Sequence, residues 1–232
     1  MARHAAHYLR LLDLPFRTWV RSDGPITLRE RSTSASHVLV AISDRAIEPF
    51  LIEHSFLRDK VCVHFSGSLT TELAVGAHPL MTFTEKLYSL DEYRKIPFIL
   101  EKGRGTLGEL LPGLPNPSHA IDAKSKALYH ALCVMAGNFT VLLWEKTFSV
   151  FSKRFGLPKT VLVPYLERIS KNLAEAKPNE SVLTGPLARG DRSTIESNLD
   201  SLDGDPFADV YRAFVGAHEQ ANERANELGG TA

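Results

Sequence analysis

The chain has 232 residues, of which 44% are hydrophobic and 23% charged, and 27 lysine and arginine residues balance 27 aspartate and glutamate residues. A net charge of zero disfavours a nucleic-acid partner, which would need a basic surface to neutralise phosphates. The two cysteines, Cys62 and Cys133, lie in apolar runs without metal-type or redox-type spacing. We therefore expect buried free thiols in a cytoplasmic protein, and no metal site.

Two further patterns bear on location. No basic-then-apolar leader stands at the start of the sequence, so secretion is not expected. The longest nearly apolar stretch, residues 131–144, is interrupted by Asn138 and Thr140 and is too short to span a bilayer. We expect no membrane partner.

The sequence opens with a helical pattern, MARHAAHYLRLL, and continues with an extended segment, FRTWVRS, at residues 16–22. A helix followed by a strand is the back half of a βαβ unit, so the central first strand is expected to be missing through N-terminal shortening. In dinucleotide-binding proteins a G-x-G-x-x-G/A loop precedes such a helix, and the ribose-reading residue follows about 20 positions later. Arg21 and Ser22 fall there. An arginine suits a 2′-phosphate and favours NADP over NAD; alternatively, the two residues form a polar turn before Gly24.

The next segments alternate between apolar runs and helical patterns. Strands are predicted within HVLVAISD (37–44), VCVHFSGS (61–68), AHPLMTF (77–83) and PFILE (97–101). Nearly continuous apolar strands separated by amphipathic helices are typical of a parallel sheet covered on both faces. Residues 1–121 are thus predicted to form a Rossmann-like α/β domain without its first strand.

The second half is helical, so the fold class is α/β plus all-α. One long helix is predicted over residues 122–155, and three more lie within 161–176, 192–202 and 206–225. The long helix is apolar almost all round through 131–143 and must be covered on every side. We therefore expect residues 122–232 to form a helical domain through which the chain is a homodimer.

Three polar residues interrupt the long apolar helix. Lys126, His130 and Asn138 are 4 and 12 positions apart and fall within about 120° of one another on a helix. A reductase needs a proton donor beside its hydride acceptor, and Lys126 or His130 fits that role while Asn138 orients substrate. Alternatively, Lys126 is a solvated helix-start residue, His130 an interface histidine, and Asn138 fixes helix register.

Residues that follow predicted strands form a second group, because open α/β sheets bind ligands at the carboxyl ends of strands. Ser66 and Gly67 follow one strand, and the backbone of Ala41, Ile42 and Ser43 follows another, where it would flank a nicotinamide ribose. All five are candidate cofactor-binding residues, or ordinary loop residues.

The loop TGPLARGD, from Thr184 to Asp191, supplies the candidate substrate-binding residues Thr184, Arg189 and Asp191. Its glycines and proline are strong turn signals. Arg189 could hold a carboxylate or phosphate in a bidentate manner, or it could pair with Asp191 and shape the loop.

KALYHALCVMAGNF, LTGPLARGD, SGSL and GAHPLMTF together resemble an uncharacterised family that pairs a Rossmann-like NAD(P)-binding domain with a helical dimerisation domain of unknown function. This architecture is similar to that of 6-phosphogluconate dehydrogenase, ketopantoate reductase and pyrroline-carboxylate reductase. The resemblance implies an oxidoreductase with its active site between the domains. The missing Gly-rich loop departs from the pattern and implies impaired cofactor binding.

The resemblance also draws attention to His78, since a similar Gly-x-His-Pro-Met pattern places a substrate-binding histidine in prephenate dehydrogenases. A His-Pro turn at a strand end is the alternative. The leading hypothesis is an NADP-dependent oxidoreductase acting on a small carbonyl, imine or hydroxy acid. The alternatives are a dimeric, non-catalytic binding or regulatory protein on the same scaffold and a prephenate-type dehydrogenase.

Overall fold

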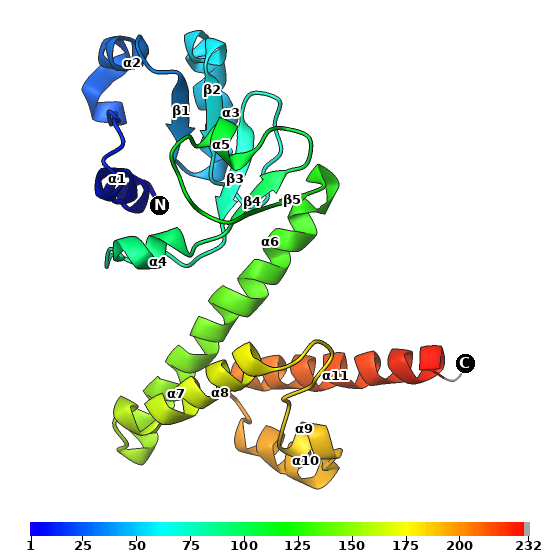
Figure 1. Cartoon of the computed structure of the whole chain (residues 1–232). Coiled ribbons are helices and arrows are strands. Elements are labelled where there is room, and N and C mark those ends of the chain that lie inside the picture. The colour runs from blue at the N-terminus through cyan, green and yellow to red at the C-terminus, as the bar shows by residue number, and fades with distance from the viewer. Residues whose placement is uncertain (230–232) are drawn as a thin grey trace. The chain divides into compact units, whose positions relative to one another are not determined.

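The computed structural model describes residues 1–229, and the chain divides into two compact units, Met1–Thr147 and Phe148–Ala232. The first unit is α/β and the second is helical, which confirms the predicted fold class (Figure 1). One long helical segment crosses the division between the units, and the predicted domain boundary at residue 121 stays a prediction.

A five-stranded sheet with strand order β1-β2-β3-β4-β5 forms the centre of the first unit. Its strands are β1 (His37–Val40), β2 (Val61–His64), β3 (Val75–Pro79), β4 (Phe98–Glu101) and β5 (Ser118–Ile121). All neighbouring pairs are parallel except β3 and β4, which are antiparallel.

The antiparallel pair departs from the predicted all-parallel sheet, and the path of the connection explains it. The helix between these strands, α4 (Leu90–Arg94), packs against α1 (Ala2–Leu11) instead of crossing the sheet. Because no crossover helix returns the chain to the start of β3, β4 enters beside the end of β3, where the Leu80 N–H donates to the Pro97 carbonyl at 2.9 Å.

Helices cover both faces of the sheet. Besides α1 and α4, three helices precede β5 in the first unit: α2 (Gly24–Ser32), α3 (Asp44–Glu53) and α5 (Leu107–Leu110). Consecutive side chains of a strand point to opposite faces, so Cys62 and Val63 belong to two different buried clusters. Cys62 is a buried free thiol as predicted, whereas Cys133 is only partly buried.

The predicted strand at residues 16–22 is wrong. Residues 13–20 form neither helix nor strand, and Arg21–Asp23 is a short 3₁₀ helix. β1 is an edge strand that pairs only with β2, and the segment does not add to its open edge. An extended segment without a ladder partner does not form sheet structure.

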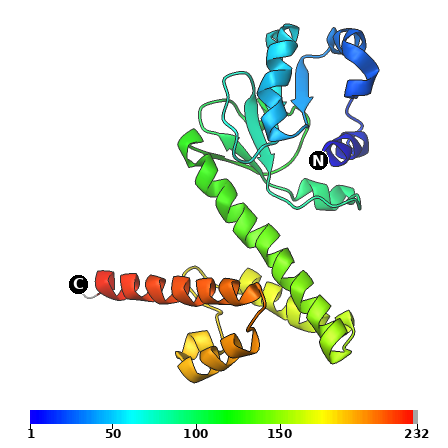
Figure 2. The same cartoon turned by 180° about the vertical axis from the view of Figure 1, so that it is seen from behind.

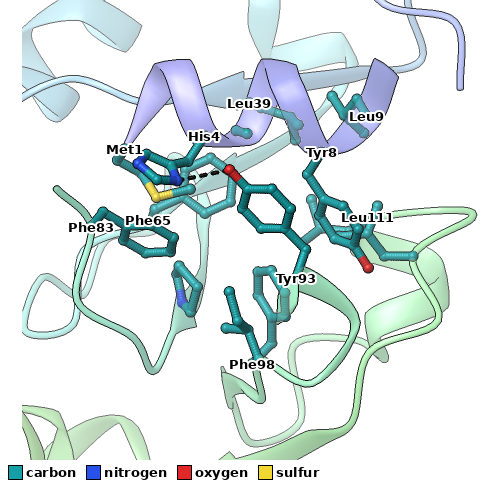
Figure 3. A pocket seen from close by; sticks show the side chains of 14 residues that line it. Met1, His4, Tyr8, Leu9, Leu39, Phe65, Phe83, Tyr93, Phe98 and Leu111 are labelled. Atoms are coloured by element: carbon teal, nitrogen blue, oxygen red, sulfur yellow. Dashed lines mark hydrogen bonds between the residues drawn. The ribbon is translucent and has the colours of Figure 1, made fainter. Parts of the chain in front are cut away.

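A small, partly open pocket lies between α1 and the sheet (Figure 3). Its walls are almost entirely apolar, with Leu9 and Leu39 among the lining side chains. The polar groups of its wall are hydrogen-bonded, since the Tyr93 hydroxyl contacts His4 Nδ1 at 2.8 Å and His4 Nε2 contacts the Thr84 carbonyl at 2.7 Å. Such a lining offers nothing to a phosphate or a reacting polar group.

The predicted long helix is confirmed over Ala123–Phe155, and it contains one irregularity. A 3₁₀ turn (Ala123–Ser125) leads into α6 (Lys126–Val134), a π-helix η4 (Met135–Phe139) follows, and α7 (Thr140–Phe155) completes it. The stretch 131–144 alone is too short to span a membrane. The whole helix is long and apolar enough to do so by length and composition, with a best mean hydropathy of 1.5.

The three other predicted helices are also confirmed, with small changes at their ends. They are α8 (Val163–Glu175), α10 (Arg192–Ser201) and α11 (Phe207–Gly229), and a short helix α9 (Pro186–Arg189) precedes α10 (Figures 1 and 2).

Candidate functional site

The carboxyl ends of β1 and β2 meet at one edge of the sheet because the two strands are parallel. The Ser66 hydroxyl, which follows β2, donates to Asp44 Oδ2 at 2.5 Å, and Asp44 is the first residue of α3. Ser66 Oγ in turn accepts from the Leu69 backbone N–H at 3.0 Å. This contact ties the two strand ends together and fixes the turn that contains Gly67.

Gly67 lies against two imidazole rings. A Cβ at this position would stand 2.5 Å from His130 Cδ2 and 3.2 Å from His78 Nε2, so no larger residue fits without displacing a ring. The rings of His78 and His130 are 6.1 Å apart between centroids and nearly perpendicular. Strand β3 supplies His78 and helix α6 supplies His130, so three elements converge on one turn.

The opposite side of the His78 ring contacts a tyrosine. His78 Nδ1 lies 2.7 Å from the Tyr129 hydroxyl, and the two rings meet edge to face. Burial, and then the nearby His130 and Lys126, lower the pKa of His78 to about 4, although Asp44 acts in the opposite direction. Burial, and then a hydrogen bond with Cys133, raise the pKa of Tyr129. Both groups are therefore neutral near pH 7.

Close to His78, a lysine and a glutamate form a buried ion pair. Lys126 Nζ donates to Glu101 Oε1 at 2.7 Å, with the side chains only 5% and 1% exposed. The same oxygen accepts the Gly76 backbone N–H at 3.2 Å. A Cβ on Gly76 would stand 2.4 Å from Lys126 Nζ and 2.6 Å from Glu101 Oε1, so the pair needs a glycine here. Arg104 lies 3.6 Å from the other carboxylate oxygen.

His64, the last residue of β2, is fully buried close to this pair. Its Nδ1 accepts the Ser66 backbone N–H at 3.2 Å, and its Nε2 has no hydrogen-bond partner within the described part of the chain. Burial, followed by the positive charge of Lys126, lowers the pKa of His64 to about 4. An accepting Nδ1 leaves the single proton of the neutral ring on Nε2.

The structure brings four of the candidate residues together: His78, His130, Ser66 and Gly67. Lys126 is near them but buried in its ion pair, which neither the catalytic nor the solvated interpretation anticipated. Asn138 is exposed and lies within the π-helix, where the extra residue in the turn changes the helical spacing from which its position was predicted.

The remaining cofactor candidates lie at the surface of the first unit. Arg21 and Ser22 are exposed in their 3₁₀ helix, which favours neither the 2′-phosphate interpretation nor the polar turn. Ala41, Ile42 and Ser43 link β1 to α3 at the carboxyl end of the sheet, as predicted from the strand pattern.

The loop candidates Thr184, Arg189 and Asp191 lie in the second unit. Asp191 is the N-cap of α10 and accepts the Thr194 hydroxyl at 2.7 Å and the Thr194 backbone N–H at 3.1 Å, and these hydrogen bonds, the hydroxyl first, lower its pKa. Arg189 lies 3.8 Å from Asp191 Oδ2. The local pairing that was an alternative in the sequence is therefore present.

Sequence reasoning missed Tyr129, Glu101 and His64. Each had a weak signal: Tyr129 precedes a candidate histidine, and Glu101 and His64 are the polar last residues of otherwise apolar strands. A polar residue at the end of a buried strand must find a partner there, which is the signal that could have found them.

Within the described residues, the site offers hydrogen-bonding groups, and its lysine is held in the ion pair with Glu101. His78 and His130 lie next to Gly67, and the Tyr129 hydroxyl contacts the far nitrogen of the His78 ring. The backbone and hydroxyls of the two strand-end turns surround the same edge. Such an arrangement can polarise a carbonyl or imine and exclude bulky groups.

Comparisons with known proteins give the same fold. A Bacteroides fragilis protein provisionally assigned as an NADP oxidoreductase is 20% identical, with 94% of each chain covered and a TM-score of 0.72. A Thermotoga maritima protein is 25% identical over 87% of each chain, with a TM-score of 0.61. The imine reductase of Streptomyces aurantiacus is 14% identical over 91% of this chain and 86% of its own, with a TM-score of 0.53.

No curated protein sequence matches the chain. The model of a domain of unknown function, DUF2520, matches residues 99–217, which is just over half of the chain. This agrees with the resemblance found in the sequence, a Rossmann-like domain followed by a helical domain of unknown function. The chain belongs to the DUF2520 family.

Proposed function

We propose that this chain is an NADP-dependent oxidoreductase that acts on a small carbonyl, imine or hydroxy-acid substrate. One observation carries the proposal: the neutral imidazole of His78 faces Gly67 at the carboxyl end of β2, the edge at which open α/β sheets bind ligands. Two chains of the same fold, one assigned as an NADP oxidoreductase and one an imine reductase, suggest the cofactor and the reaction class.

The residues of the site suit such a reaction. His78 would donate a hydrogen bond to the carbonyl oxygen or imine nitrogen and stabilise the charge that develops there, and His130 would flank the same atom. The absence of a side chain at Gly67 lets both imidazole rings approach the turn closely. The Lys126–Glu101 pair would hold the start of α6, and therefore His130, against the sheet.

The exposed groups around the sheet edge fit a nicotinamide cofactor in part. The residues after β1 and the Ser66–Gly67 turn would face the nicotinamide ribose, and the exposed guanidinium of Arg21 would bind the 2′-phosphate. A bound nicotinamide would supply or accept the hydride.

Binding and turnover of NADPH test the proposal. We expect NADPH to stabilise the folded chain, by about 2.7 kcal/mol at a hundredfold excess over Kd, and NADH to do so less. Arg21→Ala should remove that preference, whereas Arg17→Ala, a change at another exposed arginine, should leave it intact. NADPH oxidation should follow when cyclic imines or small keto acids are added, and His78→Ala should abolish it.

Two outcomes would reject the oxidoreductase. NADPH binding without turnover of any carbonyl or imine would favour the non-catalytic binding or regulatory protein. The absence of both binding and turnover would contradict the cofactor as well as the reaction.

We further propose that the chain is a cytoplasmic homodimer. Leu128, Leu132, Met135 and Phe139 on the long helix are each about half exposed or more, and an apolar surface of that extent marks an interaction site. Light scattering should give twice the mass of the chain, and Leu132→Glu should give the monomer. Partition of the wild-type chain into detergent or membranes would contradict the dimer and favour a membrane span.

A further inference from the structure

The His78 ring has two different neighbours, one at each nitrogen. Nδ1 lies 2.7 Å from the Tyr129 hydroxyl, and Nε2 faces Gly67, where a Cβ would stand only 3.2 Å away. A neutral imidazole carries a single N–H, so the nitrogen that holds the proton decides whether the ring offers Gly67 and its surroundings a donor or an acceptor.

We propose that Tyr129 is a positioning residue that holds the proton of His78 on Nε2, because its hydroxyl donates a hydrogen bond to Nδ1. Only the expected effect of Tyr129 on the kinetics rests on the proposed function. The tautomer itself is a property of the chain.

Two arrangements of the protons are compatible with the distances. In the first, the Tyr129 O–H donates to Nδ1 and His78 presents an Nε2–H. In the second, an Nδ1–H donates to the Tyr129 oxygen, and the Tyr129 O–H turns to the sulfur of Cys133, the other group with which Tyr129 interacts.

The chemistry of the three groups favours the first arrangement. A phenol O–H is a stronger donor than an imidazole N–H, and an imidazole nitrogen is a far better acceptor than a thiol sulfur, which accepts only weakly. The second arrangement would exchange a strong O–H···N bond for a weak O–H···S bond. Burial keeps both Tyr129 and His78 neutral, so neither proton is lost to solvent near pH 7.

The consequence concerns the kind of substrate atom that the site accepts. An Nε2–H next to Gly67 is complementary to an atom with a lone pair, such as a carbonyl oxygen or an imine nitrogen. A protonated amine or iminium at the same place would meet a second proton donor. The favoured ligand atom is therefore an unprotonated oxygen or nitrogen, such as that of a carbonyl or an imine.

NMR of the ring nitrogens tests the tautomer without any turnover. In ¹⁵N-histidine-labelled chain near pH 7, with His78 assigned by comparison with His78→Gln, we expect a pyrrole-type signal for Nε2 and a pyridine-type signal for Nδ1. Tyr129→Phe should move both signals toward the average of the two tautomers. Tyr88→Phe is the matched control, because the Tyr88 hydroxyl binds the Thr82 carbonyl instead, and it should leave them unchanged.

Cys133→Ala separates the two arrangements. The proposal expects unchanged His78 signals in this variant, because the Tyr129 proton is directed to Nδ1. A pyridine-type Nε2 in the wild-type chain, a Cys133→Ala variant with altered signals, or a Tyr129→Phe variant with unaltered signals would each overturn the proposal. Circular dichroism confirms that Tyr129→Phe, which keeps the ring, is folded.

Kinetics provide the second readout once a substrate is known. We expect Tyr129→Phe to lower kcat by about 10- to 100-fold with little change in KM, the range seen when the hydrogen-bond partner of a metal-ligating histidine is removed. A change in KM alone would assign Tyr129 to binding and overturn the positioning role. If no substrate is found, the proposed function fails while the tautomer measurement still stands.

Discussion

Replacing Lys126 by methionine removes one half of the buried ion pair with Glu101. The carboxylate that remains is only 1% exposed and keeps the Gly76 N–H as its nearest donor. Removing one partner of a buried pair costs about 3–5 kcal/mol, because the other charge is left without compensation. Arg104, 3.6 Å from the second carboxylate oxygen, offsets part of this charge, so we expect a loss near 3 kcal/mol.

Urea unfolding followed by tryptophan fluorescence measures this loss. Both tryptophans, Trp19 and Trp144, belong to the first unit and report on it directly. With a slope of about 1–3 kcal/mol per molar urea, the midpoint should fall by roughly 1–3 M. The matched control is Lys124→Met at an exposed lysine of the same segment, which should change stability by less than about 0.5 kcal/mol.

A second substitution shows whether charge is the cause. Glu101→Met added to Lys126→Met removes the unpaired carboxylate, and we expect it to recover part of the loss, although the Gly76 N–H then lacks its acceptor. A loss below about 1 kcal/mol for Lys126→Met would refute the buried pair as a source of stability, and a double variant no more stable than Lys126→Met would show that the unpaired charge is not the cause of the loss.

Three further predictions concern the first unit. Gly76→Ala should destabilise it by at least about 2 kcal/mol, because the added methyl group meets both charged side chains, whereas Gly108→Ala, with open space around its Cβ position, should be neutral or slightly stabilising in the same urea assay. The pKa of His64 falls from 6.5 to about 4 on folding, so between these pH values the unfolded chain binds a proton that the folded chain does not. The free energy of unfolding should therefore drop as the pH falls from about 6.5 to about 4, by at most roughly 3 kcal/mol for this residue. We expect His64→Leu to reduce the dependence of the free energy of unfolding on pH across that range, and the dependence that remains should come from His78. An unchanged dependence on pH would contradict the assignment to His64. Ala5→Leu, directed into the apolar pocket under α1, should raise the free energy of unfolding by about 0.5–2 kcal/mol, and a loss of stability would show that the pocket does not accept a larger side chain.

The elements that periodicity predicted best are those buried on both faces. The runs around Val40 and Val63 are strands, because burial leaves a clear apolar signal. The apolar pattern of 131–143 also lies in one long helix, although most of its side chains are exposed within the chain. The segment at 16–22 has strand-like residues but no strand, since a strand depends on a neighbour that the local sequence does not reveal.

The sequence predicted the positions of those site residues that follow directly from the parallel arrangement of the strands. Parallel strands bring their ends together, and this placed Ser66 and Gly67 at the correct edge. The partnership of Lys126 with Glu101 joins residues 25 positions apart across the antiparallel strand β4, whose direction the pattern did not show. The contact between Tyr129 and His78 likewise depends on the angle at which α6 leaves the sheet.

The π-helix η4 has a consequence for how this chain is compared with its relatives. A π turn holds one residue more than an α turn, so deleting a single residue from Met135–Phe139 would restore regular α spacing instead of breaking the helix. Insertions and deletions are therefore tolerated at this point more readily than elsewhere in Ala123–Phe155. An alignment gap opened there keeps Tyr129 and His130 in register with their counterparts, whereas a gap opened earlier in the helix would pair both with the wrong residues.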